Sequence, residues 1–144
     1  KTEVSQTQET EKSSIMTCDT EQRLLKKLED FESSEMFLQS NMSLSFLSTE
    51  FETNTKYLSY IVNTYRNKDF NNYINSLRIR YIIRKLSSTP LCRQYKISAL
   101  AEECGFSSQA KFSTIFKNET SFSPSSFIKY LGEENHHPKI KKHL

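Results

Sequence analysis

Apolar residues recur along most of the chain at the three- and four-residue spacing of amphipathic helices. The clearest stretch is 97–131, in which two such helices are joined by a tight turn. Gly105 supplies the positive φ that ends the first helix, and Ser107 or Ser108 can cap the second. A Ser-Pro pair at 123–124 then starts a third helix. Two short helices joined by a turn that contains Gly predict a helix-turn-helix unit.

The same arrangement occurs once before, within 43–65. Ser43 starts its first helix, and Asn54 or Thr53 caps its second. The two copies form an internal repeat in their physical pattern, although few residues are identical. Their corresponding apolar positions are Leu47, Phe51, Leu58 and Val62 in the first copy and Leu100, Cys104, Phe112 and Phe116 in the second.

A longer helix is predicted between the copies, at 70–88. It is apolar on two sides, with Phe70, Ile74, Leu77 and Tyr81 on one and Ile79, Ile82, Ile83 and Leu86 on the other. Such a helix is expected to pack against two lobes. About nineteen residues at ~1.5 Å each give a rod of roughly 28 Å. That length approaches the ~34 Å between successive major-groove faces on one side of DNA.

The sequence therefore predicts an all-α protein of about seven helices, with two helix-turn-helix lobes joined by a long linker helix. We expect the first lobe at 20–69, where Thr20 caps an opening helix, the linker helix at 70–88 and the second lobe at 89–132. The polar composition of 1–19 predicts a linker or disordered lead-in. Residues 133–144 are expected to form a flexible basic tail.

Charge is distributed unevenly beneath the net value of +3. Residues 1–53 carry five Lys/Arg against eleven Asp/Glu, whereas residues 54–144 carry fifteen against six. A basic C-terminal portion suits a polyanionic partner, with an ordinary solvated surface as the alternative.

The spacing of the three cysteines does not match that of metal ligands, which favours free thiols in a reducing compartment. No apolar run is long enough to span a bilayer, so this segment is expected to make no membrane contact.

Two stretches of the sequence, one in the second predicted lobe and one that runs from the first lobe into the linker helix, resemble those of a known protein family. LAEECGFSSQAKFSTIFK and the following SPSSF resemble the second helix-turn-helix of the AraC/XylS family of bacterial transcription regulators. Upstream, TNTKYLSYIVNTYRNKDFNNYINSLRIRYIIRKL resembles the family's first recognition helix and linker helix. The resemblance implies an AraC-type double helix-turn-helix DNA-binding domain over 20–132. The chain departs from the family pattern at Ser48, where Ala is usual, at Glu52, where a small residue is usual, and at Asn67 and Ser121, where Gly is usual.

The implied function is sequence-specific binding of double-stranded DNA, with two recognition helices in successive major-groove segments. The resemblance also implies a cytoplasmic protein, RNA polymerase as a partner if it is an activator, and no cofactor. The chain starts at Lys1 without Met, which suggests a piece of a longer protein whose sensor or dimerisation domain lies elsewhere. A helical domain that binds protein or RNA is the alternative. An enzyme is not expected, because Glu102 and Glu103 lack a nucleophilic partner and no Gly-rich phosphate loop is present.

The face of the first recognition helix that would meet DNA follows from its inner face. Advancing 100° per residue from an inward Leu58 turns a polar group outward. Lys56 would bind guanine or phosphate, and Tyr60 a thymine methyl or phosphate. An ordinary polar helix face is the alternative. The expected DNA-binding residues are Lys56, Ser59, Tyr60 and Asn63, to which the resemblance adds Thr55 at the helix start.

The second recognition helix also has an outward face that would meet DNA. Gln109 could read adenine, Ala110 could contact a thymine methyl, and Thr114 or Ser108 could bind phosphate. The expected DNA-binding residues are Ser108, Gln109, Ala110, Lys111, Ser113, Thr114 and Lys117. Candidates for neutralising the phosphate backbone are Arg78, Arg80, Arg84, Lys85, Arg93 and Lys96. No metal site is expected, because the histidines of the tail have no Cys or acidic partner at ligand spacing.

Overall fold

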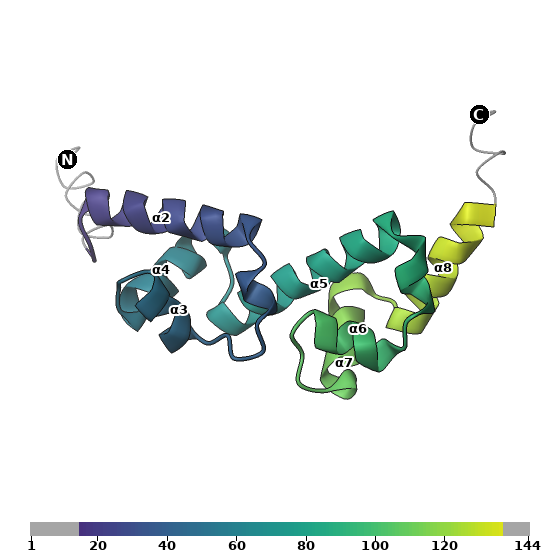
Figure 1. Cartoon of the computed structure of the whole chain (residues 1–144). Coiled ribbons are helices and arrows are strands. Elements are labelled where there is room, and N and C mark those ends of the chain that lie inside the picture. The colour runs from purple at the N-terminus through teal and green to yellow at the C-terminus, as the bar shows by residue number, and fades with distance from the viewer. Residues whose placement is uncertain (1–14, 137–144) are drawn as a thin grey trace, which may run out of the picture. The chain divides into compact units, whose positions relative to one another are not determined.

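The computed structural model describes residues 15–136, and every regular element within them is helical (Figure 1). This confirms the all-α prediction of about seven helices. Two 3₁₀ helices, η1 (Met36–Leu38) and η2 (Pro90–Gln94), lie among the α-helices. The seven α-helices of the described residues are α2 (Cys18–Ser33), α3 (Leu44–Glu50), α4 (Thr55–Arg66), α5 (Phe70–Ser88), α6 (Ile97–Glu103), α7 (Gln109–Thr120) and α8 (Pro124–His136).

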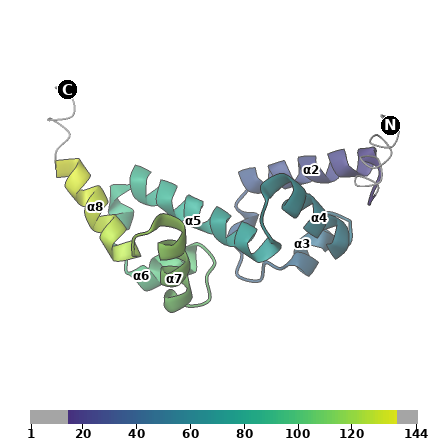
Figure 2. The same ribbon diagram turned by 180° about the vertical axis from the view of Figure 1, so that it is seen from behind.

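Contacts within the chain define two compact units. The first consists of the described residues up to Met36 together with Asn41–Tyr73, and so contains α2, α3, α4 and the first turn of α5. The second consists of Phe37–Ser40 together with the described residues from Ile74 onward, and so contains the rest of α5 with α6, α7 and α8 (Figure 2). Each unit holds one of the two predicted helix-turn-helix pairs.

The first unit is a three-helix arrangement in which α2 and α3 both pack against α4. Its core is made of fully buried aliphatic side chains and of Phe31, whose ring meets Phe51 edge to face at 6.1 Å. The Glu32 carboxylate at the end of α2 accepts hydrogen bonds from Arg66 and from the Tyr73 hydroxyl. These bonds join the ends of α2 and α4 to the start of α5.

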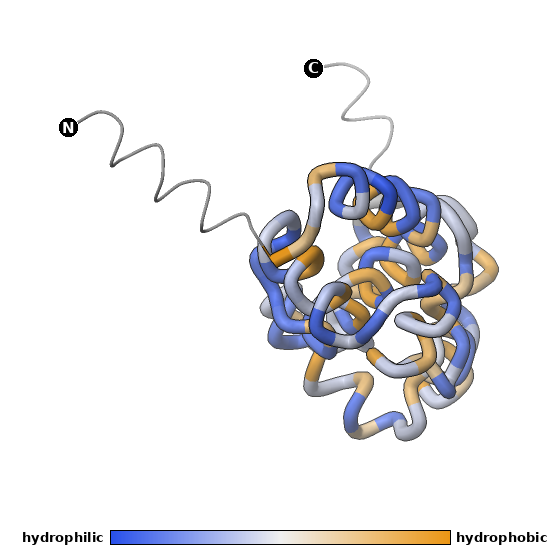
Figure 3. Tube along the Cα trace, turned by 90° about the vertical axis from the view of Figure 1, so that its left-hand side faces the viewer, coloured by the Kyte–Doolittle hydropathy of each residue, from blue (hydrophilic) through white to orange (hydrophobic). Residues whose placement is uncertain are grey.

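The second unit repeats this plan, with α6 and α8 packed against α7. Its core contains a row of aromatic rings, in which Phe112 lies 5.7 Å from Phe116 and Phe116 lies 5.4 Å from Phe127. Ile82 and Leu86 of α5 complete the same core. Polar and apolar residues alternate within single helices, as amphipathic helices require (Figure 3).

Helix α5 has the predicted bounds, Phe70–Ser88, and it contributes residues to both units according to their position along the helix, not according to the two predicted sides. Phe70 and Tyr73 are buried within the first unit, whereas Ile79, Ile82 and Leu86 are buried within the second. The helix ends at Ser88, immediately before Thr89-Pro90, since the residue before a proline disfavours the helical conformation.

The start of α2 differs from the sequence prediction. The helix begins at Cys18, and its N-cap is Thr17, whose hydroxyl accepts from the Thr20 amide at 3.2 Å. Thr20 therefore lies in the first turn and is not the cap, because Thr17 stands three residues ahead of an amide that it can satisfy. Met16 is buried beside this start. Of the expected lead-in, residues 1–14 lie outside the described residues, as does the expected tail beyond His136.

Among residues 15–136, three residues other than glycine adopt positive φ, and all three occupy turns of the helix-turn-helix pairs or the ends of their second helices. Asn67 (φ 57°) ends α4 and Ser121 (φ 70°) ends α7. Glu52 (φ 57°) lies in the turn between α3 and α4. These are positions at which the sequence departs from the family's small residues, so the backbone keeps the left-handed conformation although the glycine is absent.

We expect Ser121→Gly to raise the free energy of unfolding by about 1 kcal/mol, because a side chain with a Cβ atom is strained in the left-handed region. Asn67→Gly is the matched control and should change stability by much less, because Asn tolerates this conformation. Urea unfolding followed by circular dichroism compares the two variants with the parent. An equal gain at both positions would contradict the assignment of strain to Ser121.

Candidate nucleic-acid interface

The first recognition helix, α4, is fixed by its cap and by its inner face. The Asn54 side chain accepts from the Tyr57 amide at 2.8 Å, which satisfies one of the amides left open at a helix start. Leu58, Ile61 and Val62 are fully buried and hold the helix against α2 and α3. The opposite side of α4 is therefore left facing outward.

The turn before α4 sets the angle at which that helix leaves α3. The Thr53 amide donates to the Ser48 carbonyl at 2.9 Å, and the Glu52 backbone has the positive φ described above. Ser48 is buried, and its hydroxyl donates to the Leu44 carbonyl at 2.7 Å. Serine is tolerated where the family pattern has Ala because this bond satisfies its polar atom.

The outward side of α4 carries the residues that its periodicity predicted. Ser59 and Tyr60 lie three and four residues after Lys56, and Asn63 lies four and three residues after them, so the four residues form one stripe, which we call the α4 stripe. Lys56 and Asn63 are exposed, and Ser59 and Tyr60 are half-buried. Thr55 is exposed at the first helical position.

The second recognition helix, α7, is built in the same way. The Ser108 hydroxyl accepts from the Lys111 amide at 3.1 Å, and Phe112 and Phe116 are fully buried beneath the helix. The outward group, which we call the α7 stripe, consists of Ala110, Ser113, Thr114 and Lys117, with Gln109 and Lys111 beside its N-terminal end. All of these are exposed except Ser113, which is half-buried.

The candidates for phosphate binding are in very different surroundings. Arg80, Arg84 and Lys96 are exposed. Lys85 is half-buried and forms an ion pair with Glu103, and this hydrogen bond raises the pKa of the Lys85 ammonium. The Arg93 guanidinium donates to the carbonyls of Leu86 and Ser87 at the end of α5, at 2.8 and 3.2 Å. Arg93 is thus largely occupied in closing the helix.

The structure contradicts the expectation that Arg78 binds phosphate. Only 7% of it is exposed, and its guanidinium donates to the carbonyls of Phe37 and Gln39, each at 2.8 Å. Burial lowers its pKa. A guanidinium enclosed in this way cannot reach a phosphate, so the prediction for Arg78 is wrong. The sequence held one hint, because Arg78 stands between the apolar positions Leu77 and Ile79 on a helix with two buried sides.

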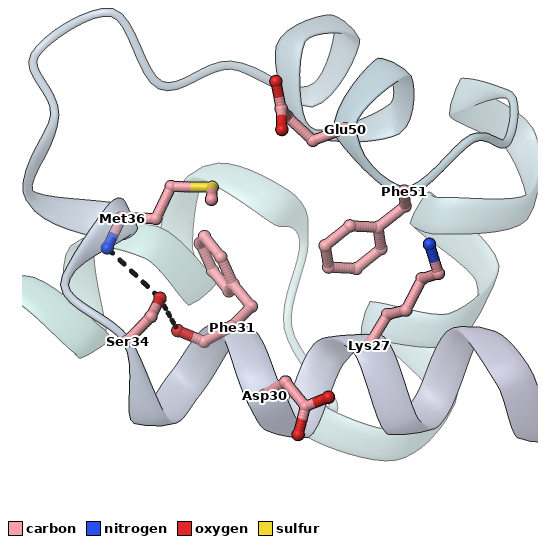
Figure 4. A pocket seen from close by; sticks show the side chains of 7 residues that line it. All are labelled: Lys27, Asp30, Phe31, Ser34, Met36, Glu50 and Phe51. Carbon is pink, nitrogen blue, oxygen red and sulfur yellow. Dashed lines mark hydrogen bonds between the residues drawn. The ribbon is translucent and has the colours of Figure 1, made fainter.

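A hollow of about 230 Å³ lies in the first unit, beside the second half of α2 and the end of α3 (Figure 4). At its edge the Ser34 hydroxyl donates to the Phe31 carbonyl at 2.6 Å and accepts from the Met36 amide at 3.2 Å. It contains no residue of the α4 stripe, so we do not include it in the site. Its lining residues are Lys27, Asp30, Phe31, Ser34, Met36, Glu50 and Phe51.

Two further findings concern the described residues alone. No three His, Cys, Asp or Glu side chains among them lie close enough together to hold a metal ion. None of their helices has the length and apolar character needed to cross a membrane. His137 and His143 of the tail lie outside the described residues, so the expectation of no metal site there remains a prediction.

The comparisons with known proteins agree with this geometry. The family model described as a helix-turn-helix domain matches residues 47–130, which runs from α3 into α8. Together with the solved structures below, this match shows that the chain belongs to the AraC-type helix-turn-helix family of DNA-binding domains found in transcription regulators. No curated protein matches the sequence.

Three solved structures illustrate the likeness. The C-terminal domain of AraT, a response regulator from Geobacillus stearothermophilus, has a TM-score of 0.65 and 22% identity, over 74% of this chain and 84% of that one. The C-terminal domain of the two-component response regulator yesN from Fusobacterium nucleatum has a TM-score of 0.61 and 25% identity, over 72% and 96%. A transcriptional regulator with an AraC-type DNA-binding domain from Chromobacterium violaceum has a TM-score of 0.62 and 17% identity, over 80% and 96%.

The reactivity of the three cysteines tests the second helix-turn-helix. Cys18 is exposed, whereas Cys92 and Cys104 are buried, and burial raises the pKa of the Cys104 thiol to about 12. Because only a thiolate reacts readily, we expect one fast thiol toward an aromatic disulfide reagent at pH 8 and three after denaturation. Cys18→Ser should remove the fast phase. A second fast thiol in the native protein would contradict the burial of Cys92 in η2 or of Cys104 at the end of α6.

Proposed function

We propose that residues 20–132 form a sequence-specific DNA-binding domain of a bacterial transcription regulator that places α4 and α7 in successive major-groove segments of double-stranded DNA. In this proposal residues 20–69 are the first lobe, α5 is the linker helix and residues 89–132 are the second lobe. The α4 and α7 stripes contact base edges. The exposed cations Arg80, Arg84 and Lys96 contact phosphates.

The observation that carries the proposal is the repeated presentation of a polar stripe on a capped and buried helix. α4 and α7 each have twelve residues, a side-chain N-cap and fully buried apolar residues at the centre of the inner face. Within the described residues, Lys56, Ser59 and Asn63 make no side-chain hydrogen bond or ion pair, so their donors and acceptors are available. Side chains of these types form the hydrogen bonds by which proteins read base edges in the major groove.

Charge supports a division of labour between the two units. Described side chains of the second unit include nine Lys/Arg against four Asp/Glu, whereas those of the first include six against nine. Phosphate attraction requires cations and does not depend on base sequence. The second unit is therefore the better source of general affinity for DNA, and the α4 stripe contributes chiefly to sequence preference.

The remaining partners follow from the same proposal. A bacterial regulator acts in the cytoplasm, and it contacts RNA polymerase if it activates transcription. A sensor or dimerisation domain outside this segment would supply its signal. The competing function is a helical domain that binds protein or RNA. An RNA-binding domain predicts equal or stronger binding to an RNA of matched length, and a protein-binding domain predicts weak binding to both nucleic acids. A duplex DNA pool and an RNA pool compared in one buffer therefore separate the two functions.

We expect affinity for duplex DNA to fall steeply as salt rises. Each phosphate contact contributes about −0.9 to the slope of log K against log salt concentration, because bound cations release condensed counterions. Fluorescence anisotropy with a labelled duplex, repeated at several salt concentrations, gives this slope. A flat dependence between low and moderate salt would count against DNA as the partner.

Substitutions should separate base reading from phosphate binding. Lys56→Ala or Tyr60→Ala should cost about 1–3 kcal/mol on the preferred site and relax the preference at one or two base pairs. Arg84→Ala should weaken binding to all sequences alike and reduce the salt slope by about one unit. Lys85→Ala, its neighbour, should change the slope less, because Glu103 already neutralises Lys85.

Selection of preferred sites from one random duplex pool, carried out with the parent and all four variants, decides this prediction. The parent's preferred site serves as the reference for both kinds of effect. If Lys56→Ala and Tyr60→Ala keep the parent's base preferences and lose affinity uniformly, then the α4 stripe does not read bases. If Arg84→Ala changes the preferred sequence, its assignment to phosphate is wrong.

A further inference from the structure

The buried Arg78 holds a short segment of chain that lies far from it in sequence. We call Phe37–Ser40 the strap; it belongs to the second unit although it lies between α2 and α3 in the chain. Arg78 donates from Nε to the Phe37 carbonyl and from Nη2 to the Gln39 carbonyl. Two donors on separate nitrogens of one planar guanidinium thus fix two alternate carbonyls, in a rigid geometry that a lysine ammonium, with all its donors on one nitrogen, does not have.

The turn that follows α6 also lies close to the strap, next to the Arg78 guanidinium. An added Cβ at Gly105, whose φ is +91°, would lie 2.4 Å from the Leu38 carbonyl oxygen. The Phe37 ring meets Tyr81 of α5 edge to face at 6.4 Å. Glycine at position 105 therefore does more than end α6, because it allows the strap backbone to approach the turn.

Arg78 reaches the second recognition helix through one aromatic ring. Its guanidinium carbon lies over the Phe106 ring, 5.5 Å from the ring centroid. A cation in this position is attracted to the face of the aromatic ring. Phe106 follows Gly105 in the turn, and its ring lies 5.6 Å from that of Phe112 in α7. A continuous set of contacts thus runs from the strap through Arg78 and Phe106 to the inner face of α7.

We propose that Arg78 is a positioning residue for the second recognition helix: by holding the strap carbonyls and the Phe106 ring together, it fixes the direction in which α7 presents its stripe. Arg78 does not touch DNA. It acts on which bases the α7 stripe reads, and the α4 stripe does not depend on it. This inference rests on the proposed function and assigns one residue's role within it.

The test uses substitutions that keep charge. Arg78→Lys retains the positive charge and loses the planar pair of donors. Arg23→Lys is the matched control, since Arg23 is an exposed arginine of the first unit that is not assigned to DNA and whose guanidinium also donates to a backbone carbonyl, that of Phe51. Site selection from a random duplex pool is repeated with both variants. Lys56→Ala marks the base pairs read by α4, and Gln109→Ala marks those read by α7.

We expect Arg78→Lys to lose discrimination, by about fivefold or more per base pair, at the positions that Gln109→Ala marks. Discrimination at the positions marked by Lys56→Ala should remain, and the salt slope should not change. Arg23→Lys should keep the parent's discrimination at the positions that Gln109→Ala marks. Uniform loss of affinity with the parent's preferences intact would overturn the inference and leave Arg78 as a stabilising residue alone. A smaller salt slope would overturn it too, because it would place Arg78 on a phosphate.

Two measurements keep the inference separate from folding and from the proposed function. If circular dichroism shows that Arg78→Lys is not folded, Phe106→Leu, which keeps an apolar side chain and removes the ring, is judged by the same criterion. Hydrogen exchange on the proteins without DNA should show faster exchange in the strap and the first turn of α7, with α4 unchanged. Unchanged exchange in α7 would overturn the inference about Arg78. A parent protein without any base preference would refute the proposed function, and the exchange result would still test the role of Arg78.

Discussion

Burial of the inner faces of α4 and α7 is the constraint on which the rest of the structure depends. A helix of twelve residues is marginal in water by itself, because nucleating a helix is costly and few hydrogen bonds repay it. Each fully buried large apolar side chain, such as Leu58 or Phe112, contributes roughly 1.5–3 kcal/mol. The surrounding helices exist to supply that burial, and the polar stripes remain outward because the inward positions are taken.

Much of the fold could be predicted because the local sequence determines where each helix begins and ends and which of its faces is buried. The caps at Ser43, Asn54 and Ser108 and the bounds of α5 follow from side-chain hydrogen bonds and apolar spacing, which act within a few residues. The start of α2 was missed because Thr17 and Thr20 are both competent caps, and only the geometry selects between them. The strap was missed because its partners, on α5 and after α6, are distant in sequence.

The candidate site likewise has residues that local sequence predicts and one residue, Arg78, whose place depends on tertiary contacts. The α4 and α7 stripes follow from helical geometry once Leu58 and Phe112 are known to face inward, so periodicity alone places them. Arg78 could not be placed in this way. Its neighbours on α5 gave the register of an apolar helix, but nothing local indicates that two carbonyls arrive from residues 37 and 39 to satisfy its donors. The burial of an arginine can be recognised only when the acceptors of its hydrogen bonds are known, and tertiary structure brings these acceptors to it.

The uneven charge gives the two units different consequences under the proposed function. Attraction between cations and phosphates is the same for every sequence, so it raises specific and non-specific affinity together. Only groups that meet base edges change the ratio between the two affinities. The α4 stripe carries a single cation, Lys56, on a unit whose described side chains are acidic overall. Such a unit adds little to non-specific binding, and each base contact that it makes therefore counts almost fully toward discrimination. The basic second unit has the opposite balance, and for that reason the orientation of α7, rather than its charge, determines what it adds to specificity.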